Sequence, residues 1–186
     1  MGKLKRFCKS AVAAYFIATG AALAQDQQPP DLDALMAELA DPDTGNWEQV
    51  ERRIRLEWDK SGSAAMDLLL QRGREAMEAE DWDAALDHFT ALTDHAPDFA
   101  EGWHSRATVY FYKDMYGPAL DDIAHALSIN PQHFGALSGL AVILESIGME
   151  EEALDVWHML VDIHPHLPQA QESLDRLEKL YGGQPI

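Results

Sequence analysis

The chain has 186 residues, of which 47% are apolar, so it is long enough for one ordinary domain with a buried core. Its 32 acidic residues outnumber 14 basic ones and give a formal net charge of −18, which disfavours nucleic acid and anionic lipid as partners, because both attract Lys and Arg. A basic protein or peptide is the better electrostatic match. The alternative, that the charge only keeps the protein soluble, stays open.

Residues 1–24 have the pattern of a secretory signal peptide. Four basic residues precede an apolar run of 14 residues that ends in Ala22-Leu23-Ala24. This run is shorter than the roughly 20 residues that a membrane span needs. We therefore expect cleavage after Ala24, a periplasmic or secreted location, and no membrane insertion of the mature chain; an uncleaved anchor is the alternative. Because the only cysteine, Cys8, lies in this segment, the mature chain is expected to form no disulfide.

Residues 25–30 are expected to be a flexible linker, and residues 31–62 are predicted to form a pair of helices. Asn46 and Gln49 have the spacing of a capping box at the start of the second helix. One face of that helix carries an apolar stripe, formed by Trp47, Val50, Ile54 and Trp58. We expect the pair to dock on the first of the units that follow, with the stripe in the core; an exposed docking surface is the alternative.

Residues 66–167 repeat with a period of 34 residues. Small residues recur in two columns, larger residues in three others except at Ala76, and a proline closes each unit. The columns are Gly73, Ala107 and Ala141; Ala85, Ala119 and Ala153; Leu69, Trp103 and Leu137; Ala76, Tyr110 and Leu144; Phe89, Ile123 and Trp157; Pro97, Pro131 and Pro165. The small residues let two antiparallel helices approach closely, and proline lacks the donor that a continuing helix needs. Gly117-Pro118 is then the turn and first helical turn of a second helix.

This pattern resembles the tetratricopeptide repeat (TPR) family, whose helix-turn-helix unit carries W-x-x-L-G-x-x-Y, A-x-x-x-F and P. The middle unit matches it with Trp103, Ala107, Tyr110, Ala119 and Pro131. The resemblance implies an all-α, right-handed α-solenoid of three repeats, at residues 66–99, 100–133 and 134–167. It also implies a concave groove, lined by the first helix of each repeat, in which family members commonly bind peptides or partner helices.

Residues 168–181 are predicted to form a helix that caps the end of the array, because a solenoid must cover its end faces. Ala170, Leu174 and Leu177 have helical spacing, and Leu180-Tyr181 extend the stripe. The opposite face is polar, with Gln171, Asp175 and Glu178. Residues 182–186 are expected to be a loose tail.

The inward face of each first helix supplies the candidate partner-binding residues. They are Leu70, Arg74 and Met77 in the first repeat, His104, Thr108, Phe111 and Tyr112 in the second, and Ser138, Val142 and Glu145 in the third. The aromatic side chains are candidate anchors for a protein or peptide; the alternative is that Phe111 packs beneath the groove and only Tyr112 is exposed. Relatives that clamp a C-terminal carboxylate use several Lys and Asn residues, so Arg74 alone does not favour that use.

Three histidines, His158, His164 and His166, raise the alternative of a metal-handling protein. Without a second ligand cluster we interpret His164 and His166 as surface-loop residues, like His133, and we expect no metal and no cofactor. The sequence has no nucleophile elbow, phosphate-binding glycine loop or metalloprotease motif, so no enzymatic activity is expected.

We therefore expect an exported adaptor that binds a protein or peptide in the groove and assists assembly of an envelope complex. The alternative is a structural, oligomer-forming envelope component that associates through its front helices.

Overall fold

The computed structural model describes residues 31–181, which form helices and turns with no strand in that range. The helices are α1 (Leu32–Leu39), α2 (Trp47–Trp58), α3 (Ala64–Glu78), α4 (Trp82–His95), α5 (Ala100–Tyr112), α6 (Tyr116–Ile129), α7 (Phe134–Ser146), α8 (Glu150–Ile163) and α9 (Pro168–Tyr181). None of these helices is long and apolar enough to cross a membrane. The predicted signal peptide, linker and tail lie outside the described residues.

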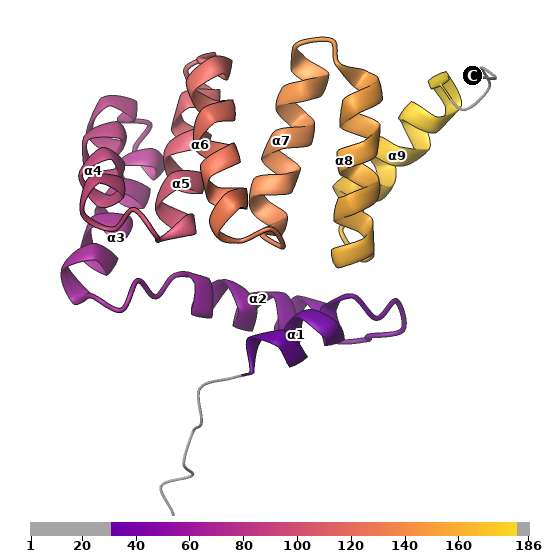
Figure 1. Cartoon of the computed structure of the whole chain (residues 1–186), viewed down its shortest axis with the longest axis horizontal. Coiled ribbons are helices and arrows are strands. Elements are labelled where there is room, and N and C mark those ends of the chain that lie inside the picture. Colours follow the sequence, from indigo (N-terminus) through magenta and orange to yellow (C-terminus); the bar gives the residue numbers. More distant parts are fainter. Residues whose placement is uncertain (1–30, 182–186) are drawn as a thin grey trace, which may run out of the picture.

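Three antiparallel helix pairs, α3–α4, α5–α6 and α7–α8, stand side by side and are followed by α9 (Figure 1). The columns of the repeat form the contacts within the pairs. Ala85, Ala119 and Ala153 are fully buried, which allows the second helix of each pair to approach the first closely. The large residues of the next column, Phe89, Ile123 and Trp157, are buried beside them. This arrangement confirms the predicted all-α solenoid.

The turn inside each repeat depends on one residue with a left-handed backbone. The residue is Glu80 in the first repeat (φ 56°), Asp114 in the second (φ 56°) and Gly148 in the third (φ 79°). The prediction that Gly117-Pro118 makes the turn of the middle repeat is therefore only half right. Both residues lie in the first helical turn of α6, where the proline ring replaces an N–H that has no helical partner.

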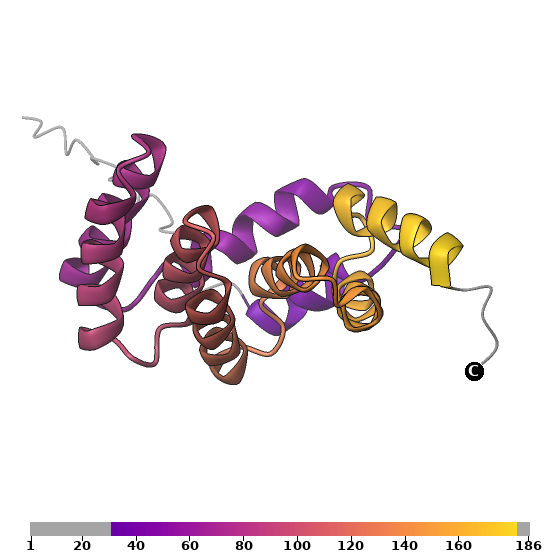
Figure 2. The same cartoon turned by 90° about the horizontal axis from the view of Figure 1, so that it is seen from above.

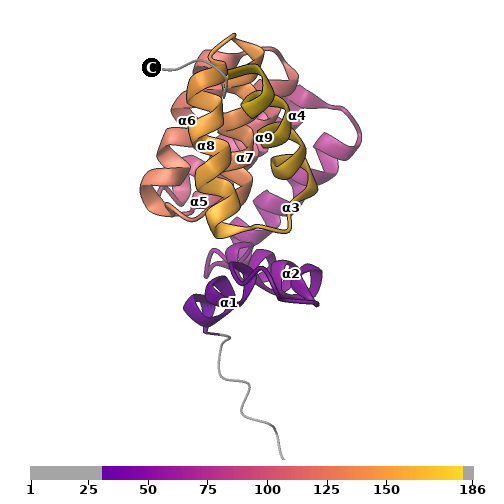
Figure 3. The same ribbon diagram turned by 90° about the vertical axis from the view of Figure 1, so that its right-hand side faces the viewer.

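The sequence led us to expect that the N-terminal pair α1–α2 docks on the first repeat, but its apolar side packs mainly on the third repeat and α9. The pair lies crosswise beneath the array, at the edge formed by the loops between repeats (Figures 1 and 3). Its buried residues Leu35, Leu39, Val50 and Ile54 share one core with α7, α8 and α9. The apolar stripe on α2 predicted a buried face but carried no information about which part of the chain would cover it.

Aromatic side chains fix α2 against the third repeat. Trp58 stacks on His133 with ring centroids 4.6 Å apart, and Trp47 stacks on His166 at 5.7 Å. Val50 and Ile54 of the stripe are buried and the two tryptophans are partly buried against the same core, while Leu56 on the other face of α2 is 61% exposed. Asn46 does occupy the cap position of α2, but its side chain makes no capping hydrogen bond, so the predicted capping box is absent.

Helix α9 closes the far end of the array and packs against α8 (Figures 1 and 2). Ala170, Leu174 and Leu177 are buried in the core that also contains Trp157 and Leu160, as predicted. The predicted extension of the stripe fails at Leu180, which is 62% exposed.

Candidate functional site: the concave groove

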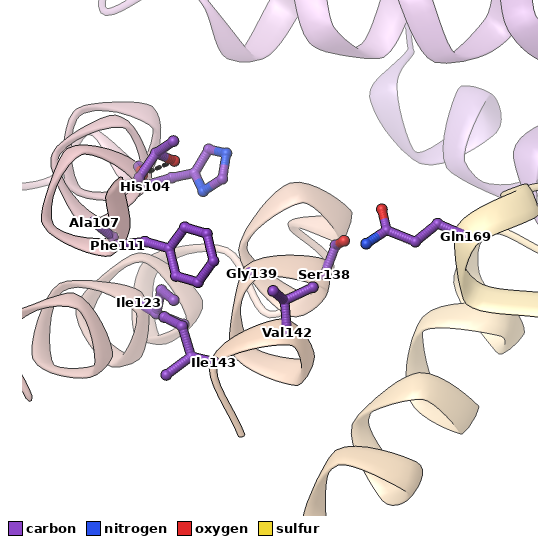
Figure 4. A pocket seen from close by; sticks show the side chains of 10 residues that line it. His104, Ala107, Phe111, Ile123, Ser138, Gly139, Val142, Ile143 and Gln169 are labelled. Atoms are coloured by element: carbon purple, nitrogen blue, oxygen red, sulfur yellow. Dashed lines mark hydrogen bonds between the residues drawn. The ribbon is translucent and has the colours of Figure 1, made fainter. Parts of the chain in front are cut away.

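A cavity of about 230 Å³ opens between the inner helices α5 and α7. Figure 4 shows Phe111 of α5 facing α7, and Gln169 extending from α9 toward Ser138. The lining comprises His104, Ala107, Thr108, Phe111, Ile123, Ser138, Gly139, Val142, Ile143 and Gln169. The structure brings five of the predicted groove residues together around one mainly apolar space: His104, Thr108, Phe111, Ser138 and Val142.

His104 is the ionisable side chain that lines this cavity, and its imidazole ring is neutral at neutral pH. Burial lowers the pKa of the imidazole to about 4. The nearby Glu101 carboxylate opposes that shift, whereas the protonated form of His133 and the charges of Arg55 and Arg74 add to it. The ring also lies 4.8 Å from that of His133, measured between centroids. A neutral imidazole and the phenyl ring of Phe111 favour an apolar or aromatic side chain as the occupant.

Glu101 lies about one helical turn before His104 on α5, and its network connects residues of four helices or their ends. Its carboxylate accepts hydrogen bonds from Arg74 of α3 at 2.7 Å and from His133, the residue before α7, at 3.0 Å. His133 Nδ1 accepts the backbone N–H of Ala136 at 3.1 Å, so the neutral ring carries its proton on Nε2 and donates it to Glu101. Arg74 also donates two hydrogen bonds to Asp59, which follows α2.

The charges of this network are strongly stabilised. Burial alone would raise the pKa of Glu101. The hydrogen bond from His133, the positive charges that His104 and His133 carry at low pH, and the charge of Arg74 together lower it to about 2. The bidentate bond to Asp59 is the main cause that raises the pKa of Arg74 above its usual range. Arg74 is thus occupied by two carboxylates and does not stand free in the groove.

A second, more open cavity of about 390 Å³ lies along α3. Leu70 and Arg74 line it together with Gln71 and four carboxylates, which belong to Asp59, Asp67, Glu75 and Glu78. Leu70 itself is only 2% exposed, so it contributes to the floor of this cavity and to the core of the first repeat. The polar part of the surface is therefore acidic, even with the guanidinium of Arg74 included.

The remaining predicted groove residues lie elsewhere. Met77 packs against the core of the first repeat. Tyr112 is 57% exposed and stacks on Trp82, with ring centroids 4.9 Å apart, outside the α5–α7 cavity. Glu145 accepts a hydrogen bond from the indole N–H of Trp157 at 2.7 Å and another from Arg176. Met77, Tyr112 and Glu145 therefore contact other side chains of the array and do not line the α5–α7 cavity.

Several lining residues were not foreseen from the sequence. Gly139 and Ile143 follow Ser138 and Val142 by one position each, so a wider inward stripe on α7 would have included them. Gln169 comes from the capping helix, whose return toward the groove depends on how α9 packs against α8, and no local pattern shows that.

The histidines near the loops between repeats are not all surface residues, contrary to the sequence interpretation. His133 and His164 are fully buried, and His164 Nε2 lies 3.2 Å from Glu51 of α2. The hydrogen bond with His164 lowers the pKa of Glu51 to about 2. His166 bonds the backbone carbonyl of Asp41 at 2.9 Å, whereas His158 approaches Glu178 on α9. Within residues 31–181 no group of three His, Cys, Asp or Glu side chains lies close enough together to hold a metal ion.

Known proteins resemble this chain in sequence and in fold. A TPR repeat-containing protein of Rhizobium etli is 42% identical over 155 residues, which cover 81% of this chain and 75% of the relative. No protein-family model matches the chain.

Among solved structures, the first TPR of Spaghetti (RPAP3), bound to an HSP90 peptide of sequence SRMEEVD, has a TM-score of 0.60 at 20% identity. This match covers 63% of the present chain and 94% of the other. MamA has a TM-score of 0.58 at 17% identity, covering 81% of this chain and 83% of that one. The two solved structures support the fold. Because the Rhizobium protein is 42% identical to this chain over three quarters of its own length, the chain belongs to the tetratricopeptide repeat family.

Proposed function

We propose that this protein is a non-catalytic scaffold that binds another protein through a peptide segment held in the concave groove. The observation that supports this most directly is the mainly apolar cavity between α5 and α7, which five residues of the predicted inward face help to line. A structural neighbour, the first TPR of Spaghetti, holds a peptide. The buried network around Glu101 joins α3, α5 and α7, so the groove is held in shape before a ligand arrives.

Binding in the groove is tested with a variant whose larger side chain fills the α5–α7 cavity. Ser138→Trp places a large ring in the α5–α7 cavity, and Met159→Trp adds the same ring on α8 at a residue that is 52% exposed and absent from the cavity lining. Both variants are compared with the unaltered protein in a crosslinking pull-down, after circular dichroism has shown the same helical signal. Partners that bind in the groove should disappear with Ser138→Trp and remain with Met159→Trp. Equal recovery by all three proteins would contradict the proposal.

We further propose that the protein is exported and acts in the cell envelope, where it assists assembly of a complex. The support is the signal-like pattern of residues 1–24. The test is to recover a C-terminally tagged form from cell fractions and to determine its N-terminal residue by mass spectrometry. We expect a periplasmic or secreted product that begins at Gln25. A product that begins at Met1 and remains in the cytoplasm would refute the export.

A further inference from the structure

The two cavities share part of their repeat positions on neighbouring inner helices. The α3 cavity also extends to the free end of the array, because Ser105 and Val109, the counterparts of Gln71 and Glu75 on α5, are buried between repeats. Leu70 and Arg74 of α3 occupy the repeat positions of His104 and Thr108 of α5, one period of 34 residues later. The first two residues line the open cavity along α3, and the other two line the cavity between α5 and α7. A ligand that crosses the inner helices therefore meets both cavities in succession.

The two cavities differ in chemistry. The α5–α7 cavity contains no carboxylate or basic side chain apart from the neutral imidazole of His104. The cavity along α3 contains four carboxylates and one guanidinium, and the guanidinium of Arg74 is already bonded to Asp59 and Glu101. Glu75 and Glu78 are exposed on α3 and face this opening. The electrostatic match for this end of the groove is a cation.

The distance between the two cavities sets how many peptide residues must lie between the two contacting side chains of the ligand. Packed helices lie about 8–10 Å apart, so the outer side of α3 is roughly 15–20 Å from a cavity between α5 and α7. An extended peptide advances about 3.3 Å per residue, so roughly four to six residues connect the two positions.

We propose, on the basis of the groove-binding function above, that the ligand is an extended peptide segment with an apolar or aromatic residue for the α5–α7 cavity and a Lys or Arg a few residues away for the carboxylates of α3. This ligand is opposite in charge to SRMEEVD, the peptide held by the Spaghetti neighbour, which has two Glu and one Asp against a single Arg. The acidic opening along α3 repels such a sequence.

The experiment uses a random linear peptide library displayed on phage and selected against the full protein. Retained peptides are then measured by fluorescence anisotropy against two matched double variants. Glu75→Gln with Glu78→Gln removes two charges at the α3 cavity, whereas Glu151→Gln with Glu152→Gln removes two exposed charges from the first turn of α8. We expect retained peptides to combine an apolar residue with Lys or Arg. Their affinity should fall roughly three- to tenfold with the α3 variant, by the usual size of exposed charge pairs, and remain unchanged with the α8 variant.

The outcomes separate the two proposals. Retained peptides that are acidic or neutral, or that lose the same affinity with both double variants, overturn the basic-ligand inference while leaving the groove intact. A library that yields no peptide, or peptides that bind Ser138→Trp as well as the unaltered protein, overturns the proposed function itself. Self-association that Ser138→Trp abolishes would identify a second copy of the chain as the occupant and would also overturn the inference.

Discussion

Substitution of Gly73 by alanine tests the closest helix contact in the first repeat. A Cβ atom at Gly73 would lie 2.3 Å from Cε1 of Phe89 and 2.6 Å from its Cζ. Carbon atoms in good contact are about 3.5–4.0 Å apart, so the ring would have to retreat by more than about 1 Å. Phe89 is completely buried, so the ring cannot move out into solvent.

The expected effect has two parts of opposite sign. Overpacking a filled core destabilises by about 1–3 kcal/mol, and the fixed ring of Phe89 places this site toward the upper end. Alanine in place of glycine inside a helix returns about 1 kcal/mol. Gly73→Ala should therefore lower the free energy of unfolding by about 1–2 kcal/mol. The matched control is Gly139→Ala in α7, where the nearest atom, Cδ1 of Ile123, is 3.5 Å away, so only the gain of about 1 kcal/mol remains.

Urea unfolding followed by circular dichroism measures both variants. Gly73→Ala should also melt about 2–8 °C lower than the unaltered protein, because a domain of this size loses about 2–4 °C per kcal/mol. Phe89→Leu, which removes the clashing ring, should rescue Gly73→Ala in a double-mutant cycle with a coupling of at least about 1 kcal/mol. If both glycine variants stabilise the protein equally, the assigned contact between Gly73 and Phe89 is wrong.

Three other variants and conditions test separate parts of the structure. Burial lowers the pKa of His104 from 6.5 to about 4, so the unfolded chain binds a proton at a higher pH than the folded protein does. The free energy of unfolding should therefore fall by about 3 kcal/mol as the pH drops from 6.5 to 4. Urea titrations of His104→Gln should lack this decline. Glu101→Gln should destabilise by about 1.5–3 kcal/mol in the same assay, because it weakens charged hydrogen bonds at a site only 11% exposed; a loss below about 0.5 kcal/mol would contradict the network. Glu80→Gly should raise the melting temperature, with a gain of up to about 1 kcal/mol, since glycine tolerates φ 56°; a lower melting temperature would show that the turn relaxes in another way.

The part of the fold that the sequence predicted is the part in which neighbours along the chain are also neighbours in space. Gly73, Ala85 and Phe89 belong to one repeat and meet within it, so their recurrence every 34 residues predicts both the pairing and the packing. The same reasoning placed His104 and Phe111 on the inward face. Each of these predictions needs only helix geometry and a short turn.

The predictions that failed depend on contacts between distant segments. Val50 and Ile54 show that α2 has an apolar face, but many surfaces of an array can cover such a face. Glu101 gave no sign of burial, because its partners Arg74 and His133 lie 27 and 32 residues away and become neighbours only after folding. His164 was predicted to lie at the surface for the same reason, since its partner Glu51 on α2 precedes it by 113 residues.

The position of α1–α2 has a consequence for how the molecule assembles. In a simple solenoid each unit needs only the unit before it, so the chain can become ordered from its beginning toward its end. Here α1 and α2 share a core with α7, α8 and α9, the last helix described. Their final packing therefore becomes possible only after these later helices have formed. Synthesis from the N-terminus therefore delays the final closure, and loss of α9 would expose part of the core on which α1 and α2 pack.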